Sequence, residues 1–108
     1  MIDWEHVNQL RTDVGDGFDD IVEVFLQEVS DRLARVDVDA DLQTLAADLH
    51  FLKGAALNLG FQDFAERCAR GEDSAMAGRR GEVTLSELIQ SFEDTRAAFV
   101  SGLSRQAA

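Results

Sequence analysis

The chain has 108 residues, with 21 acidic side chains against 10 basic ones and a formal net charge of -11. This balance repels phosphate backbones and acidic lipid surfaces, so we expect neither nucleic acid nor a membrane as a partner. The chain lacks proline and tyrosine and is 45% hydrophobic, which favours long helices over strands. We therefore predict a single all-α domain over residues 1–108.

Cysteine content and the first residues bear on where the protein resides. Cys68 is the only cysteine, so an internal disulfide is excluded and a reducing compartment fits. The opening MIDWEHVNQL has neither the basic start nor the apolar run of a signal peptide. We expect a cytoplasmic protein that is monomeric.

The first predicted elements are a short helix and a long one. Asp3 can cap a short helix that carries Val7 and Leu10, and the glycines of residues 15–17 interrupt the pattern. Apolar residues then recur at three- and four-residue steps, which predicts a helix of about 20 residues. That apolar face comprises Phe18, Ile21, Val22, Phe25, Val29, Leu33 and Val36.

The acidic segment 37–41 (DVDAD) resembles the start of a calcium-binding loop. Leu42 would occupy the sixth position of such a loop, where the sharp turn requires glycine. Asp48 would occupy the twelfth position, where a bidentate glutamate is expected. We therefore expect Asp39 or Asp41 to cap the next helix instead.

Three more helices are predicted after this boundary. One covers about residues 40–59 and ends at Gly60, and the next begins at Phe61 and decays in the glycine-punctuated region 71–81. The last begins at a capping box formed by Thr84 and Glu87. Four long helices with short links predict an antiparallel four-helix bundle with a short additional N-terminal helix.

His50 lies within the helix predicted over about residues 40–59, on the side away from the predicted core face of that helix. At about 100° per residue, His50 is about 140° from the centre of that face. A core histidine is therefore disfavoured. A metal ligand is also disfavoured, because His6 is the only other histidine and no ligand stands one turn from His50 on its own face. The core face comprises Leu45, Leu49, Leu52, Ala56 and Leu59.

The predicted outward face around His50 is unusual because its residues are small or apolar and nearly uncharged. Such a face is typical of a docking site, although a neighbouring helix could also cover part of it. Lys53, one turn from His50, can place a cation beside an anionic group on the imidazole. Gly54 costs the helix about 1 kcal/mol relative to alanine, and it leaves room for a partner. The candidate partner-binding residues are Gln43, Ala46, Ala47, Gly54 and Leu57.

These residues carry a family resemblance. His50, Leu52, Lys53, Gly54 and Gly60 match the H-x-L-K-G-x5-G signature of histidine-containing phosphotransfer (HPt) domains. The chain also resembles the family in its Ile-Asp opening, in Phe-Leu-Gln-Glu of the long helix, and in a cysteine eight residues after the last glycine of the signature. The resemblance covers roughly residues 2–104.

The resemblance implies a four-helix bundle whose exposed histidine relays phosphate. His50 would accept a phosphoryl group from the aspartyl phosphate of a receiver domain and pass it to an aspartate of another receiver. Lys53 would assist the phosphate, and Gly54 would let the receiver approach. Many members have a glutamine that hydrogen-bonds the imidazole, and the matching position here is Glu72. The residues alone leave the orienting partner of the imidazole undecided.

The sequence also bears on cofactors and on kinase activity. The sequence has no glycine-rich phosphate loop, so we expect no ATP-dependent kinase activity and no cofactor. The Mg²⁺ of the transfer is expected on the receiver. Two alternatives stay open, namely a receiver-binding bundle that acts as a phosphate sink without relaying, and a helical adaptor in which His50 is incidental.

Overall fold

The computed structural model describes residues 1–107, and the last residue of the predicted domain, Ala108, lies outside this range. The described chain forms five α-helices and two short 3₁₀ turns. The α-helices are α1 (Trp4–Val14), α2 (Phe18–Arg35), α3 (Leu42–Asn58), α4 (Gln62–Met76) and α5 (Leu85–Ala107), and the 3₁₀ turns are Gly15–Gly17 and Arg80–Glu82.

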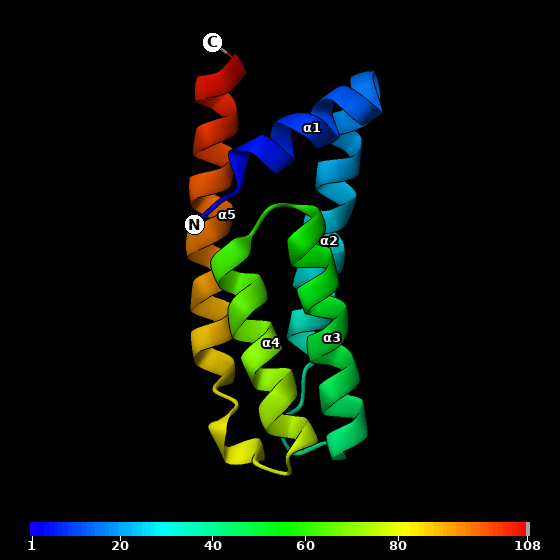
Figure 1. Ribbon diagram of the computed structural model, residues 1–108, viewed down its shortest axis with the longest axis vertical. Coiled ribbons are helices and arrows are strands. Elements are labelled where there is room, and N and C mark those ends of the chain that lie inside the picture. Colours follow the sequence, from blue (N-terminus) through cyan, green and yellow to red (C-terminus); the bar gives the residue numbers. More distant parts are fainter. Residues whose placement is uncertain (108) are drawn as a thin grey trace.

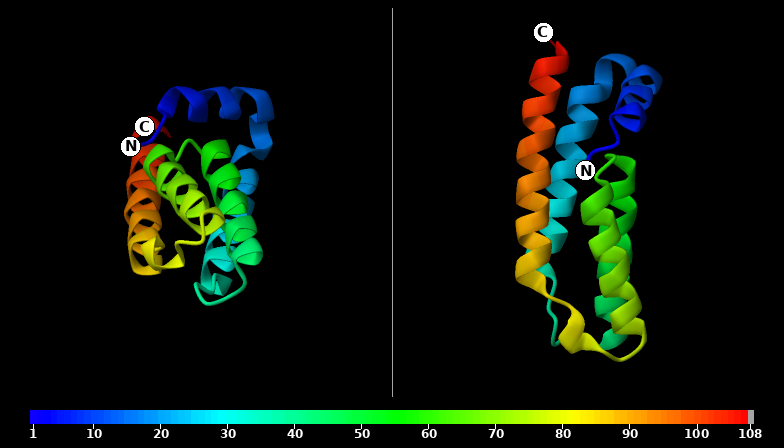
Figure 2. Two further views of the ribbon diagram at one scale, coloured as in Figure 1. Left: turned by 60° about the horizontal axis from the view of Figure 1, so that its bottom comes forward. Right: turned by 60° about the vertical axis from the view of Figure 1, so that its left-hand side comes forward.

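Helices α2 to α5 run alternately up and down along the longest dimension of the molecule, which measures 46 × 20 × 20 Å (Figure 1). The shorter helix α1 crosses one end of this bundle, between the ends of α2 and α5 (Figures 1 and 2). The prediction of an all-α antiparallel four-helix bundle with an additional N-terminal helix is therefore confirmed.

Helix α1 is held at both its cap and its first residue. Asp3 is the predicted cap, and its carboxylate accepts a hydrogen bond from the backbone N–H of His6 at 3.1 Å. Trp4 stacks on Phe99 of α5 with ring centroids 5.7 Å apart. A Cβ at Gly102 would overlap the indole of Trp4, so glycine is required for this close approach. These contacts pack the N-terminal helix α1 against the C-terminal helix α5.

The acidic segment between α2 and α3 provides the cap of α3. Asp41 accepts a hydrogen bond from the backbone N–H of Thr44 at 2.7 Å, and this bond holds the pKa of Asp41 below its usual value of 3.8. Arg80 closes the segment from the other side by donating to the backbone oxygens of Val38 and Ala40 at 2.7 and 2.6 Å. Of the two predicted caps, the structure selects Asp41.

Helix α4 ends at Met76, inside the region 71–81 where the sequence predicts that it decays, and it continues five residues beyond Gly71. Gly71 is buried, and a Cβ there would lie 3.2 Å from Cδ1 of Leu49. The glycine therefore allows α4 to pack closely against α3. The chain turns later, at Gly78, whose φ of +77° favours glycine.

The core lies between the four long helices. The predicted core face of α3 is confirmed, because its five residues have no exposed surface. Phe61, Phe64 and Phe92 pack beside it with tilted rings. Cys68 is buried in the same region, and burial raises its pKa to about 12. Its thiol is therefore neutral at physiological pH and packs as a small apolar group.

Candidate functional site

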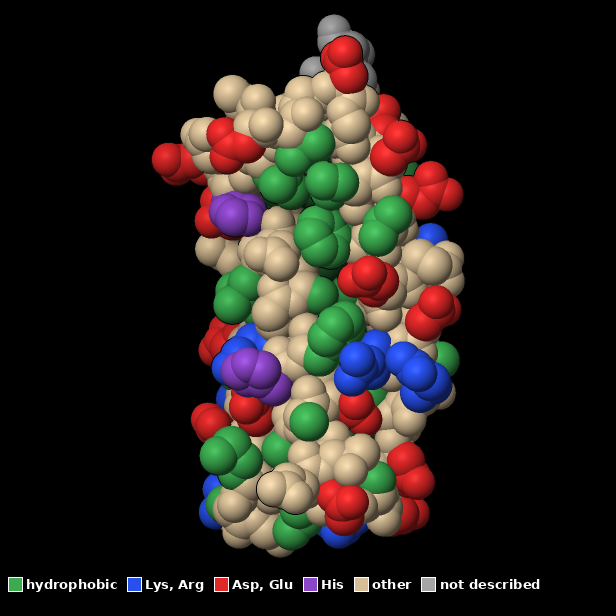
Figure 3. Space-filling view, turned by 90° about the vertical axis from the view of Figure 1, so that its right-hand side faces the viewer, with side chains coloured by type: hydrophobic (Ala, Val, Ile, Leu, Met, Phe, Trp, Pro, Cys, Tyr) green, Lys and Arg blue, Asp and Glu red, His purple; other side chains and the backbone are tan. Residues whose placement is uncertain are grey.

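His50 projects from the middle of α3 into solvent. Its side chain is 67% exposed, as its position on the helix predicts. Figure 3 shows both histidine side chains on one face of the molecule, well separated along its long axis. The other histidine, His6, has its Nε2 2.9 Å from the backbone oxygen of Asn58. The two rings therefore have different surroundings.

Glu72 of α4 joins His50 to Lys53. Its Oε2 lies 3.0 Å from Nδ1 of His50, and its Oε1 lies 3.1 Å from Nζ of Lys53. The Glu72 side chain is only 14% exposed, while that of Lys53 is 30% exposed. A largely buried carboxylate on one helix thus contacts two side chains that are one turn apart on the neighbouring helix.

This contact determines which nitrogen of His50 carries the free lone pair. An ionised carboxylate can only accept hydrogen bonds. A neutral imidazole that bonds to Glu72 through Nδ1 must therefore carry its hydrogen there, which leaves the lone pair on Nε2. With the side chain mostly exposed, the free nitrogen is available to an electrophile from outside the molecule.

The contact also corrects the predicted charge of the site. The sequence pattern of α3 alone indicates a face whose one charge near His50 is Lys53. The structure adds the carboxylate of Glu72 to this face. Because Lys53 pairs with that carboxylate, the two charges balance each other beside the ring.

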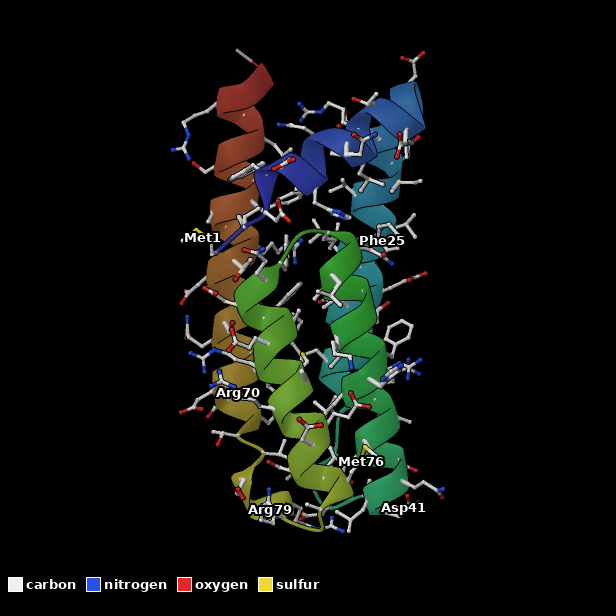
Figure 4. The ribbon with its side chains drawn as sticks, in the orientation of Figure 1. Met1, Phe25, Asp41, Arg70, Met76 and Arg79 are labelled. Atoms are coloured by element: carbon white, nitrogen blue, oxygen red, sulfur yellow. The ribbon has the colours of Figure 1, made fainter. Side chains whose placement is uncertain are left out.

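An apolar groove of about 520 Å³ opens on one side of His50, between α3 and the end of α4. Figure 4 labels Met76 at the end of α4, beside this groove, and 72% of its surface is exposed. Three of the five predicted partner-binding residues lie here, although Ala46 is partly buried. The groove is lined by Leu42, Gln43, Ala46, Ala47, His50, Glu72, Ala75 and Met76.

A second hollow, of about 290 Å³, lies on the other side of His50 between α2 and α3. Gly54 lines it, together with Phe25 of α2 and Phe51 of α3. A Cβ at Gly54 would meet no atom within 4 Å, so this position is open. Leu57, 53% exposed, lines neither hollow. Four of the five predicted partner-binding residues are thus divided between two hollows, and His50 lines both.

Sequence reasoning missed several residues that the fold brings to the site. Phe25 and Met76 come from helices other than α3, and the periodicity of α3 contains no information about them. Glu72 was identified only through the family resemblance, because its contact with His50 depends on how α3 and α4 pack. Met76 follows Glu72 by four residues, a helical spacing that places both on one face.

The fold and the site together define a class, namely a helical bundle with an exposed, oriented histidine on an outward face. The family model described as Hpt domain matches residues 20–99. The chain therefore belongs to the Hpt domain family. In comparisons with curated proteins and with solved structures, nothing matches.

Family membership places the chain in phosphotransfer of two-component signalling, and it makes receiver domains of response regulators the general class of partner. Within residues 1–107, no helix is long and apolar enough to cross a membrane.

Proposed function

We propose that this protein is an intermediate of a phosphorelay, in which His50 accepts a phosphoryl group from a receiver aspartyl phosphate and passes it to another receiver. The observation that carries the proposal is the hydrogen bond between Nδ1 of His50 and Glu72 at 3.0 Å. It leaves Nε2 as the free nitrogen of a largely exposed ring. An incidental surface histidine would not need a largely buried partner on a neighbouring helix.

In the proposed step, the lone pair of Nε2 attacks the phosphorus atom of the acyl phosphate. A nitrogen–phosphorus bond forms while the bond between phosphorus and the aspartate oxygen breaks. The aspartate leaves as a carboxylate, and the ring of His50 keeps its hydrogen on Nδ1. Transfer onward reverses these changes, because a carboxylate of the second receiver attacks phosphorus and His50 leaves as a neutral imidazole.

Lys53 and Gly54 would assist this step in different ways. The ammonium of Lys53 is held by the same carboxylate that contacts the ring of His50, and from there it can stabilise negative charge on phosphoryl oxygens. The open space at Gly54 lets the receiver bring its acyl phosphate to within about 3–3.5 Å of Nε2. We place the Mg²⁺ of the reaction on the carboxylates of the receiver.

The receiver would dock around His50 on the predicted small-residue surface. Gln43, Ala46 and Ala47 contribute the apolar groove on one side of the ring, and Gly54 contributes the hollow on the other. Leu57 extends the exposed apolar surface further along α3. A partner that covers both hollows would enclose His50 and exclude water from the transfer.

The test is transfer of labelled phosphate from a phosphorylated receiver domain. We expect the wild-type protein to acquire acid-labile, alkali-stable label and then to lose it to a second, unphosphorylated receiver. The variant His50→Gln should take up no label, whereas His6→Gln, the matched control, should behave as wild type. Label that reaches His50 and is never passed on would indicate a phosphate sink. Label retained by His50→Gln would overturn the assignment.

A further inference from the structure

We propose that Met76 is an oxidation site that controls docking beside His50. A peroxide converts its thioether to a sulfoxide, and the sulfoxide closes the apolar groove to a receiver. The inference rests on the proposed function, because it concerns the partner that would occupy this groove. It adds a chemical signal to which the docking surface responds.

The three sulfur-bearing side chains of the sequence differ in how easily an oxidant reaches them. Cys68 is fully buried, and burial raises its pKa to about 12, so its thiol is unreactive. The side chains of Met76 and Met1 are on residues that are 72% and 75% exposed. A thioether needs no deprotonation before it is oxidised, so exposure decides its reactivity. Both methionines are therefore open to a peroxide, and the cysteine is not.

One of these two methionines lies at the proposed docking surface. Met76 is the last residue of α4 and lines the groove of about 520 Å³ that also includes His50. Met1 lies at the start of α4, where its backbone oxygen accepts a hydrogen bond from the N–H of Gln62 at 3.1 Å. Figure 4 labels the two methionines toward opposite ends of this helix. Since α4 has 15 residues and a helix rises about 1.5 Å per residue, its ends are roughly 20 Å apart.

The groove suits the thioether of Met76 better than a sulfoxide. Its lining is mainly apolar, and a methionine on such a surface adapts to a partner because its side chain is flexible and polarisable. Among the described residues that line the groove, only Gln43 and His50 carry a side-chain donor, and the donor of His50 is directed at Glu72. A sulfoxide oxygen covered by a receiver would therefore lose its water and find few donors to replace it. This loss weakens docking.

The proposed step uses a peroxide as the oxidant. The sulfur of Met76 attacks one oxygen of hydrogen peroxide, so that a sulfur–oxygen bond forms and the oxygen–oxygen bond breaks. Sulfur loses two electrons, and the second oxygen takes the hydrogen of the first and leaves as water. A methionine sulfoxide reductase reverses the change, because two thiols become a disulfide and the sulfoxide oxygen leaves as water. The modification is therefore reversible.

Oxidation of Met76 should leave the bundle folded. Backbone hydrogen bonds close the end of α4, from the N–H of Ala77 to the oxygen of Asp73 at 3.0 Å and from the N–H of Arg79 to the oxygen of Ser74 at 2.8 Å. The side chain of Met76 lies mostly in water, so a polar group there changes stability little. Circular dichroism and the thermal midpoint check this point for each protein below.

The test compares wild type with Met76→Leu, which keeps an apolar side chain and cannot form a sulfoxide. Each protein is left reduced or treated with hydrogen peroxide, the peroxide is removed, and binding and phosphate uptake from a phosphorylated receiver domain are measured. We expect peroxide to weaken both about 10–100-fold in wild type, the effect of losing one apolar contact. Met76→Leu should be unaffected, although Met1 is oxidised in both proteins. A small-molecule phosphodonor should label His50 equally before and after treatment.

Three further measurements assign the effect to the sulfoxide. The tryptic peptide 71–79 contains Met76 and no other sulfur, so its mass reports oxidation of this residue alone. A methionine sulfoxide reductase with a dithiol should restore binding by the treated wild type. Met76→Gln, which is polar without any oxidant, should bind the receiver as weakly as the oxidised wild type.

Normal binding by a wild type whose Met76 is fully oxidised would overturn the inference. So would equal losses in wild type and Met76→Leu, or a Met76 that stays reduced while Met1 is oxidised. Each of these results leaves the proposed function in place, because the untreated protein still takes up phosphate. An untreated wild type that takes up no phosphate from a receiver would instead overturn the proposed function, and the effect of oxidation on docking with it.

Discussion

At the scale of single residues, Lys53 is distinctive because it is the only lysine of the chain. Its ammonium pairs with Glu72 rather than standing free beside His50. The pair is partly exposed, so its contribution to the free energy of unfolding is small, about 1 kcal/mol or less. Its importance is therefore expected in the reaction, where charge moves between groups, rather than in stability.

Replacing Lys53 with methionine tests this expectation, because methionine keeps an unbranched apolar side chain and removes the charge. We expect Lys53→Met to slow phosphate uptake by His50 about 10–100-fold, since one electrostatic contact to the phosphoryl group is lost. The thermal midpoint should change little. Lys53→Arg, which keeps the charge, serves as the control and should transfer faster than Lys53→Met. Equal rates in wild type and Lys53→Met would remove Lys53 from the mechanism.

Among the helices, α3 depends on the cap at Asp41, whose pKa is lowered by its hydrogen bonds to Thr44. A carboxyl group whose pKa is lowered by folding stabilises the folded state at pH values above its usual pKa. This stabilisation disappears as the pH falls through the pKa that the group has in the folded state. Asp41→Ala should therefore lower the thermal midpoint at pH 7, and its difference from wild type should shrink below about pH 3.8.

Asp39→Ala is the matched control for this prediction, because Asp39 is an exposed aspartate of the same segment that does not cap α3. Thermal melts followed by circular dichroism at pH 7 and pH 3 provide the comparison. If both variants had the same midpoint at pH 7, the cap at Asp41 would contribute nothing to stability.

The helices also show what the sequence can and cannot predict. The core face of α3 and the exposure of His50 follow from spacing alone, because a helix places each residue at a known angle. The continuation of α4 beyond Gly71, as far as Met76, could not be predicted in this way. Gly71 looks like a helix breaker in the sequence, but its effect depends on the contact with Leu49 of another helix. The bond from Glu72 to His50 depends on the same packing, which no periodicity specifies.

At the scale of the whole molecule, the question is how a receiver approaches His50. Gly54 and Ala47 are both exposed and lie in different hollows beside the ring. Larger side chains there should leave the fold intact, since a Cβ at Gly54 meets no neighbour and replacing this glycine favours the helix by up to about 1 kcal/mol. They should nevertheless obstruct a docking receiver.

We therefore expect Gly54→Gln and Ala47→Gln to keep their helicity and thermal midpoint but to lose receiver binding and phosphotransfer together. Small-molecule phosphodonors, which need no docking surface, should still label His50. Ala98→Gln, at an exposed position of α5, is the control and should bind as wild type. Normal transfer in both site variants would show that the receiver approaches from elsewhere, and unfolding of both would show that this face is needed for packing.

The most direct measurement of the central claim is to locate the transferred phosphate on a single atom. The protein, labelled with ¹⁵N in its histidine rings, is phosphorylated by a receiver domain, and ³¹P–¹⁵N coupling identifies the nitrogen bonded to phosphorus. We predict a bond to Nε2 of His50, because Glu72 occupies Nδ1. Phosphate on Nδ1 of His50, on His6, or on no histidine would contradict the account.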